Sequence, residues 1–220
     1  MEPSQLTRDA ERDIPHGEPP GADPDSVKLR ISYSNLVQRI YRRIALTPGP
    51  CHVARKIFLR SLGAHIGRGT AIPPCSMPWP HQVWLGDHCQ LEPGIYFKFD
   101  WYWKTGPNIL IADRVFIGRN VEFNIQGRIE IGNDCLIASG CVFIDHDHGM
   151  NLRQPMRNQR QENHPIRIGP NVWIGASAVI LKGVEISEGA VVGAGSIVTK
   201  SIPSNEVWCG NPARKMGLRH

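Results

Sequence analysis

The sequence lacks any apolar run of the length, about 18 residues, that a membrane-spanning helix needs. Its start, Met1 to Arg12, also lacks the apolar core of a secretory signal, so the cytoplasm is the expected compartment. The six cysteines include no C-x-x-C pair and no zinc-type spacing. They are therefore expected to be free thiols, most of them small fillers of the core.

Charge of either sign is not gathered into a long run. The 25 Lys and Arg residues exceed the 20 Asp and Glu residues and give a net charge of +5, which favours anionic partners such as phosphates. None of the usual nucleic-acid-binding fingerprints is present, so no nucleic acid partner is expected. With 220 residues, of which 41% are hydrophobic, the chain has room for one sizeable domain with additions.

Residues 1–26 are rich in proline and poor in apolar residues, which predicts a flexible tail. Residues 27–63 are predicted to form an N-terminal helical pair, because apolar residues recur at three- and four-residue steps. Pro48 should end the first helix and Gly63 should cap the second. The apolar face predicted for the second helix consists of Val53, Ala54, Ile57, Phe58 and Leu62.

Basic residues line the polar sides of this predicted pair. They are Arg39, Arg42, Arg43, Arg55, Lys56 and Arg60. A solvated face on a capping element is the preferred interpretation. Peripheral contact with an anionic inner membrane surface, near lipid-linked substrates, is the alternative.

After Gly63 an aliphatic residue returns every six positions. The clearest run is Ile168, Ile174, Ile180, Ile186, Val192 and Val198. Small or β-branched companions keep the same register: Val172, Ala178, Val184, Ala190 and Ser196. A period of six matches neither the 3.6 of a helix nor the alternation of an ordinary strand. In a three-sided solenoid, six residues per side place one aliphatic at the same inward position on every side, and the stacked coils bury a continuous core.

The repeat is interrupted twice. Between Phe143 and Ile168 the spacing is one residue too long for the six-residue phase, which predicts a protruding loop at about 145–165 that begins D-H-D-H. Long loops that leave a rigid scaffold often carry function. The segment Trp79–Trp103 also departs from the repeat, and its tryptophans either stack on a sugar ring or pack at a subunit contact.

Three motifs near the end of the chain are more specific than the repeat alone. They are I-G-P-N-V-W-I-G-A (168–176), V-V-G-A-G-S-I-V-T-K (191–200) and G-N-P-A-R (210–214). Over roughly Leu59 to Met216 the sequence resembles the hexapeptide-repeat acyltransferases, and the lead-in L-x-S-L-G-A-x-I-G (59–67) is similar to sugar O-acetyltransferases of exopolysaccharide and O-antigen clusters. Maltose and galactoside acetyltransferases belong to the same group. The resemblance implies an all-β fold, a left-handed parallel β-helix over 64–216, assembled as a homotrimer.

The resemblance also implies the chemistry, which is acetyl transfer from acetyl-CoA to a sugar hydroxyl without a metal. An alcohol needs a base to withdraw its proton as it attacks the thioester. In this family the catalytic histidine lies eight residues after a coil glycine, and counting from Gly140 reaches His148, with His146 as the competing choice. Asp145 or Asp147 would orient the imidazole, and Asp147 is also a candidate contact of the acceptor. Either histidine could instead be a loop residue bonded to the backbone.

The same matching assigns the donor and acceptor contacts. The residues expected along a CoA groove between subunits are Gly175, Ala176, Ala194, Thr199, Lys200 and Arg214. The two cations would meet the CoA phosphates, and the small residues would let the pantetheine lie against backbone amides. Asn120 and Asn124 occupy positions where relatives contact the sugar, although an Asn at a coil corner can equally form a turn.

Three rival readings stay open at this stage. The first is N-acetylation of a nucleotide-linked amino sugar, and the second is a β-helix scaffold without catalytic activity. The third is zinc bound by His146, His148 and His164, as in gamma-class carbonic anhydrases, and it is disfavoured because the accompanying arginine and acid are not found.

Overall fold

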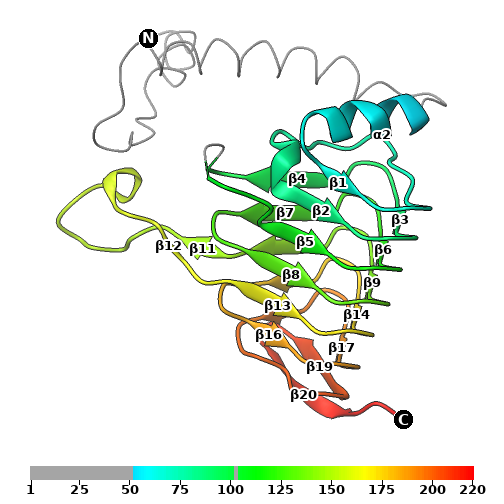
Figure 1. Ribbon diagram of the computed structural model, residues 1–220. Coiled ribbons are helices and arrows are strands. Elements are labelled where there is room, and N and C mark those ends of the chain that lie inside the picture. The colour runs from blue at the N-terminus through cyan, green and yellow to red at the C-terminus, as the bar shows by residue number, and fades with distance from the viewer. Residues whose placement is uncertain (1–51, 102–103) are drawn as a thin grey trace, which may run out of the picture. The chain divides into compact units, whose positions relative to one another are not determined.

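The computed structural model describes residues 52–101 and 104–220, all within the compact unit Ile40–His220 (Figure 1). The predicted tail, the first helix of the predicted pair, and Tyr102 and Trp103 of the tryptophan-rich segment lie outside the described residues. None of the helices in the described ranges is long and apolar enough to cross a bilayer.

Short strands stack into three sheets that form the faces of a solenoid (Figure 1). Face A consists of β1 (His65–Ile66), β2 (Val83–Leu85), β5 (Ile109–Ile111), β8 (Ile129–Ile131), β13 (Ile166–Ile168) and β16 (Glu185–Ile186). Face B consists of β4 (Tyr96–Phe99), β7 (Glu122–Ile125), β10 (Val142–Ile144), β15 (Val179–Ile180) and β18 (Ile197–Val198). Face C consists of β3 (Gln90–Leu91), β6 (Phe116–Ile117), β9 (Leu136–Ile137), β14 (Trp173–Ile174), β17 (Val191–Val192), β19 (Glu206–Gly210) and β20 (Ala213–Leu218).

The chain runs from face A to face C to face B and back to face A in every coil. Neighbouring strands of a face are parallel, apart from the antiparallel pair β19 and β20 that closes the C-terminal end. Each coil therefore has three corners, named here by the faces that they join. The corner between C and B and the corner between B and A flank face B on its two sides.

The six-residue periodicity places the core as expected. All six aliphatic residues of the run from Ile168 to Val198 are buried, and so are their five small or β-branched companions. Inside face B, Phe97, Phe123 and Phe143 stack with ring centroids 5.3 and 5.1 Å apart. The prediction of a β-helix built from six-residue repeats is confirmed.

The helix α2 (His52–Ser61) precedes the first coil, and the apolar face predicted for it is only partly buried, because Phe58 packs against the core but two other members of that face do not. Arg55 and Leu59 are buried, whereas Val53 and Ile57 are 72% and 62% exposed. The reason is polar: Arg55 Nη1 donates to the carbonyl oxygen of Ile72 at 3.0 Å, so a guanidinium takes a place that the apolar pattern assigned to aliphatic residues.

Two more basic side chains of α2 bind the first coil. Lys56 Nζ donates to the carbonyl oxygens of Gly67 at 2.7 Å and Thr70 at 3.1 Å. Arg60 Nε donates to the carbonyl oxygen of Ile66 at 3.1 Å. Because the end coil of a solenoid leaves carbonyls without a strand partner, these cations satisfy polar groups that would otherwise lack one. They support the capping interpretation of the basic residues that the structure describes.

Candidate active site

The predicted loop leaves the solenoid between β10 and β13, at the corner that joins faces B and A (Figure 1). Its two ends form an antiparallel pair, β11 (His146–Asp147) and β12 (Glu162–Asn163). A single 3-10 turn, η2 (Met156–Asn158), lies between them. The hairpin holds the first part of the D-H-D-H string close to the coils.

Asp145 is completely buried at the start of the loop. Its carboxylate accepts backbone N–H groups from Gln126 at 2.8 Å, Gly127 at 2.7 Å and Arg128 at 3.0 Å. Its Oδ1 atom also lies 3.0 Å from Nδ1 of His146. Charge-assisted hydrogen bonds of this kind are stronger than neutral ones, so Asp145 joins the loop to the corner of the preceding coil.

His146 is held on both sides of its ring. Nε2 lies 3.6 Å from Oδ2 of Asp100, opposite the contact with Asp145, and only 7% of the side chain is exposed. Asp100 is itself 3.1 Å from Nζ of Lys98. Both imidazole nitrogens therefore face carboxylate oxygens within the fold.

His148 is exposed, in contrast to His146. Its Nε2 atom lies 3.3 Å from Nε2 of Gln161, on the returning strand of the loop. The two aspartates that the sequence offered to orient this ring are placed elsewhere, Asp145 against His146 and Asp147 against Lys182. Sequence reasoning did not identify Gln161, since nothing in the polar segment marks it out from the other glutamines.

Lys182 connects the hairpin to the solenoid. Its Nζ atom lies 2.7 Å from Oδ2 of Asp147 and 3.4 Å from Oε2 of Glu162, so it contacts both strands of the hairpin. The hydrogen bond to Asp147 is the main cause that raises the pKa of Lys182 above its usual value. Lys182 follows β15, in the coil that comes after the loop. Its pairing with the hairpin depends on how the coils stack, which the sequence does not show.

Five of the six expected donor contacts lie on the two corners that flank face B, and Arg214 is the exception. Ala176 and Ala194 stack at the corner between C and B, where Gly195 N–H donates to the carbonyl oxygen of Ala176 at 2.8 Å. A Cβ atom on Gly175 would lie 2.5 Å from the backbone nitrogen of Ala194. Close packing of the coils therefore requires a glycine at 175, independently of any ligand.

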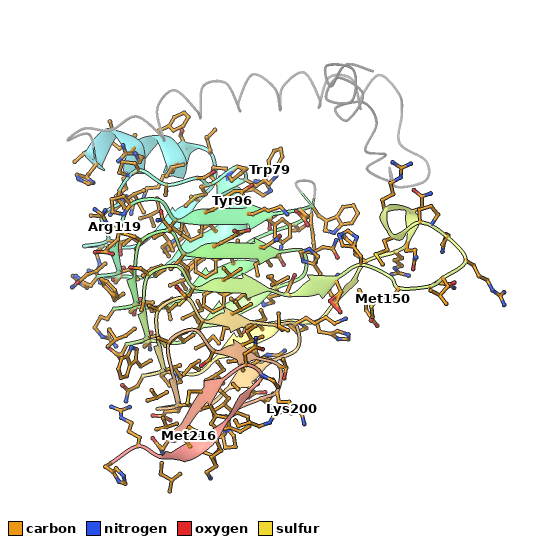
Figure 2. The ribbon with its side chains drawn as sticks, turned by 180° about the vertical axis from the view of Figure 1, so that it is seen from behind. Trp79, Tyr96, Arg119, Met150, Lys200 and Met216 are labelled. Carbon is orange, nitrogen blue, oxygen red and sulfur yellow. The ribbon has the colours of Figure 1, made fainter. Side chains whose placement is uncertain are left out.

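Thr199 and Lys200 follow β18 at the corner between B and A, the corner from which the loop projects. Figure 2 shows Lys200 on the side of the loop that carries Met150, with Arg119 at the opposite edge. Arg214 lies on β20 in the terminal hairpin, exposed, and its Nη1 atom donates to the carbonyl oxygen of Ala213 at 2.8 Å. Both predicted phosphate contacts are thus on the surface.

The two expected acceptor contacts are separated. Asn120 follows Arg119 at the corner between C and B and has a φ of +54°, a left-handed turn conformation that asparagine tolerates. Asn124 lies on β7, where its Oδ1 atom accepts from Nζ of Lys98 at 2.9 Å. Only Asn124 is therefore next to the Lys98, Asp100 and His146 contacts.

A hollow of about 560 Å³ lies near the start of the solenoid, and no loop residue lines it. Its lining includes Arg60, His65, His81, Trp84, Thr105 and Pro107. Trp84 is 41% exposed and stacks on His65, with ring centroids 3.5 Å apart. Within the described ranges no three His, Cys, Asp or Glu side chains gather as metal ligands, so the three histidines of the zinc reading are not brought together.

Comparison with known proteins agrees with this architecture. The family model described as the hexapeptide repeat of succinyl-transferase matches residues 109–143 and 165–200. Galactoside O-acetyltransferase of Escherichia coli is 36% identical over 130 residues, which are 59% of this chain and 61% of that protein. The chain thus spans about three fifths of the length of this curated relative.

Two solved structures share the fold. A hexapeptide-repeat acetyltransferase from Vibrio cholerae, complexed with acetyl coenzyme A, has a TM-score of 0.57 at 25% identity and covers 91% of this chain and 92% of its own. An N-acyltransferase from Bacillus cereus, in complex with dTDP and 3-hydroxybutyryl-CoA, has a TM-score of 0.64 at 20% identity and covers 75% and 88%. These neighbours and the repeat imply that the β-helix is left-handed. Residues 109–143 and 165–200 therefore match hexapeptide repeats, and the chain is similar to galactoside O-acetyltransferase and to a hexapeptide-repeat acetyltransferase.

Proposed function

We propose that this protein transfers an acetyl group from acetyl-CoA to a hydroxyl of a saccharide or surface-glycan precursor, with His148 as the general base. The observation that carries the proposal is the exposed imidazole of His148 on a hairpin fastened to the solenoid by Lys182. The similarity to galactoside O-acetyltransferase supports a sugar hydroxyl as the acceptor.

In the proposed reaction, His148 withdraws the proton of the acceptor hydroxyl as its oxygen attacks the thioester carbonyl. The tetrahedral intermediate carries a negative oxygen, which a backbone N–H beside Ala176 would stabilise. Collapse of the intermediate breaks the carbon–sulfur bond, and the departing thiolate takes the proton back from the imidazolium. The products are the acetyl ester and free CoA, with His148 restored.

Ala176 and His148 belong to opposite corners of face B. The proposed site therefore needs a neighbouring copy of the chain, so that Ala176 of one copy lies close to His148 of the next. The outward side chains support this. On face B the outward column is Tyr96, Glu122, Val142, Val179 and Ile197. On face C it is Gln90, Phe116, Leu136, Trp173, Val191 and Val207.

Both columns are mainly apolar, whereas the later coils of face A present Glu130, Arg167 and Glu185. Leu136 and Trp173 are 52% and 53% exposed in the single chain, which is unusual for large apolar side chains that lie in one column. Two apolar faces that meet at one corner suit a closed ring in which face B of one copy packs on face C of the next. We infer a homotrimer, with a CoA groove between copies.

The oligomer is tested by light scattering on Trp173→Glu, with Arg167→Glu on face A as the matched control. The first substitution places a charge in the proposed interface and should yield monomers that lose acetyl transfer. The second should remain trimeric. A wild-type chain that is monomeric and active would contradict the shared site.

Acylation of an amino sugar is the second candidate function. The Bacillus cereus N-acyltransferase, solved with dTDP-4-amino-4,6-dideoxyglucose and coenzyme A in one of its complexes, shares the fold at 20% identity. The same base and donor would serve an amine, and the acceptor pocket alone would differ.

One assay separates the alternatives. The purified protein is incubated with acetyl-CoA and a panel of galactosides, maltose, glucosamine and dTDP-linked amino sugars, and free CoA and product mass are measured. Sugar-dependent CoA release with an ester that mild alkali cleaves supports O-acetylation. An alkali-stable product formed only with amino sugars supports N-acetylation. If neither CoA release nor CoA binding is detected, the result favours the hypothesis of a β-helix scaffold without catalytic activity.

A further inference from the structure

We propose that a chain of side-chain amides fixes the tautomer of His148, with Gln161 as the positioning residue that contacts the ring and Gln126 as its anchor in the solenoid. The role of this tautomer in catalysis rests on the proposed function, whereas the tautomer depends only on the amide contacts. Neither aspartate of the D-H-D-H string is a link of this chain of amides, because Asp145 contacts His146 and Asp147 pairs with Lys182.

The amides are joined end to end. Asn163 Nδ2 donates to Oε1 of Gln126 at 3.2 Å, and Gln126 Nε2 donates to Oε1 of Gln161. Gln161 Nε2 then faces Nε2 of His148 at 3.3 Å. Because every amide has one donor end and one acceptor end, donation runs in a single direction, from Asn163 toward His148.

The direction determines where the imidazole proton lies. The Gln161 amide nitrogen can only donate, so its contact is a hydrogen bond only if Nε2 of His148 carries a lone pair. A neutral imidazole with a free Nε2 has its proton on Nδ1. The nitrogen that faces Gln161 is therefore the basic one, ready to accept the proton of a hydroxyl.

Gln126 can anchor the chain of amides because the solenoid immobilises it. Its side chain is buried, with the residue 2% exposed, and its backbone N–H donates to Asp145 at 2.8 Å. The contact between Gln161 and His148 is longer than a typical hydrogen bond of about 2.9–3.0 Å. An acceptor hydroxyl can thus displace the Gln161 amide from Nε2 at little cost.

The carboxylates of the two hairpin strands are engaged in other contacts. Asp147 and Glu162, one on each strand, pair with Lys182, and Glu162 Oε1 also lies 3.7 Å from Nε2 of His164. A carboxylate on His148 would instead hold a proton on the nitrogen that it faces. The amide contact and the pairing of the carboxylates with Lys182 favour the same tautomer.

Nitrogen-15 NMR of the full chain with labelled histidine tests the inference, since the two ring nitrogens have distinct shifts when protonated or bare. The His148 signals are assigned by their loss in His148→Gln, and spectra are recorded at a pH where the ring is neutral. We expect the proton on Nδ1 in the wild type. In Gln161→Leu it should move to Nε2, the position that free histidine favours in water.

Gln126→Leu should move the proton in the same way, and Gln154→Leu, an exposed glutamine of the same loop, is the matched control that should change nothing. Gln161→Glu should also place the proton on Nε2 and should lower kcat with little change in KM for the sugar. A wild-type ring protonated on Nε2, or a tautomer unchanged in Gln161→Leu, would overturn the inference. A His148→Ala protein that keeps full acetyl transfer would instead refute the proposed base and leave the tautomer result standing.

Discussion

Oδ1 of the buried Asp145 lies 3.0 Å from Nδ1 of His146, two residues before the histidine that the coil register favours as the base. This contact divides the D-H-D-H string into two parts. Asp145 and His146 are held inside the fold, whereas Asp147 and His148 lie on the surface of the hairpin. The two histidines should therefore respond differently to substitution.

We expect His148→Ala to lower turnover about a hundredfold or more, because general-base catalysis typically contributes about 10²–10⁴-fold. Its affinity for acetyl-CoA should remain nearly unchanged, as measured by calorimetry. His146→Ala should act mainly on stability, because the ring is nearly buried, with Nδ1 bonded to Asp145 and Nε2 facing Asp100. If His146→Ala remained folded and lost turnover while His148→Ala kept it, the register of the proposed base would be wrong.

Asp145→Asn should destabilise the start of the loop. The carboxylate accepts three backbone N–H groups, and the amide offers one acceptor oxygen in place of two. A hydrogen bond to a charged group contributes about 1.5–3 kcal/mol, so we expect a loss of about 2 kcal/mol or more in the free energy of unfolding in urea.

Asp147→Asn is the control for this substitution, because Asp147 is exposed and its partner Lys182 is at the surface. Screening by water makes such pairs weak, so its effect on unfolding should be much smaller. Equal losses in the two variants would show that burial of Asp145 does not matter.

The inward positions of the solenoid could be predicted because they follow a local rule. Every sixth residue meets the same packing environment, so the sequence of one coil already contains the requirement that stacking imposes. The buried face of α2 could not be predicted in this way. The partner of Arg55 is a carbonyl oxygen of the first coil, and apolar periodicity contains no information about such a partner.

The candidate site could also be predicted only where local patterns in the sequence determine it. The register from Gly140 proposes a histidine, and the sequence marks the loop through its break in phase. The contacts around the two histidines come from other coils: Asp100 directly follows β4, and Gln126 lies at a corner one coil before the loop. The lengths of the two interruptions of the repeat, the segment Trp79–Trp103 and the loop at about 145–165, determine which corners stack on one another. No pattern in the sequence predicts that stacking.

Phe123→Ala should cost about 3–5 kcal/mol, the usual range for removal of a buried aromatic ring. The ring is fully buried between Phe97 and Phe143 in the stack inside face B. Phe123→Leu fills more of the space and should cost clearly less. Urea unfolding at one protein concentration measures both, and an alanine variant as stable as the leucine variant would contradict tight stacking.

Gly175→Ala distinguishes packing from ligand contact. A Cβ atom would lie 2.5 Å from the backbone nitrogen of Ala194, so the coils must shift, and we expect a loss of stability of about 1–3 kcal/mol. Gly217→Ala is the matched control, since a Cβ atom there meets nothing within 4 Å. A Gly175→Ala protein with normal stability and a raised KM for acetyl-CoA would instead make this glycine a donor contact only.

The buried cysteines should be unreactive in the folded protein. Burial raises the pKa of Cys75 to about 12 and that of Cys135 to about 11, and it also raises the pKa values of Cys89 and Cys141. Since the thiolate is the reactive form, these thiols should stay protonated and inert toward a disulfide reagent at pH 8. Cys51 lies outside the described residues, so it is replaced by serine for this test. In the Cys51→Ser chain only Cys209, which is partly exposed, should react before guanidinium is added. The four buried thiols should react after guanidinium is added. Rapid modification of the four buried thiols in the native protein would show that the coils open far more readily than their packing implies.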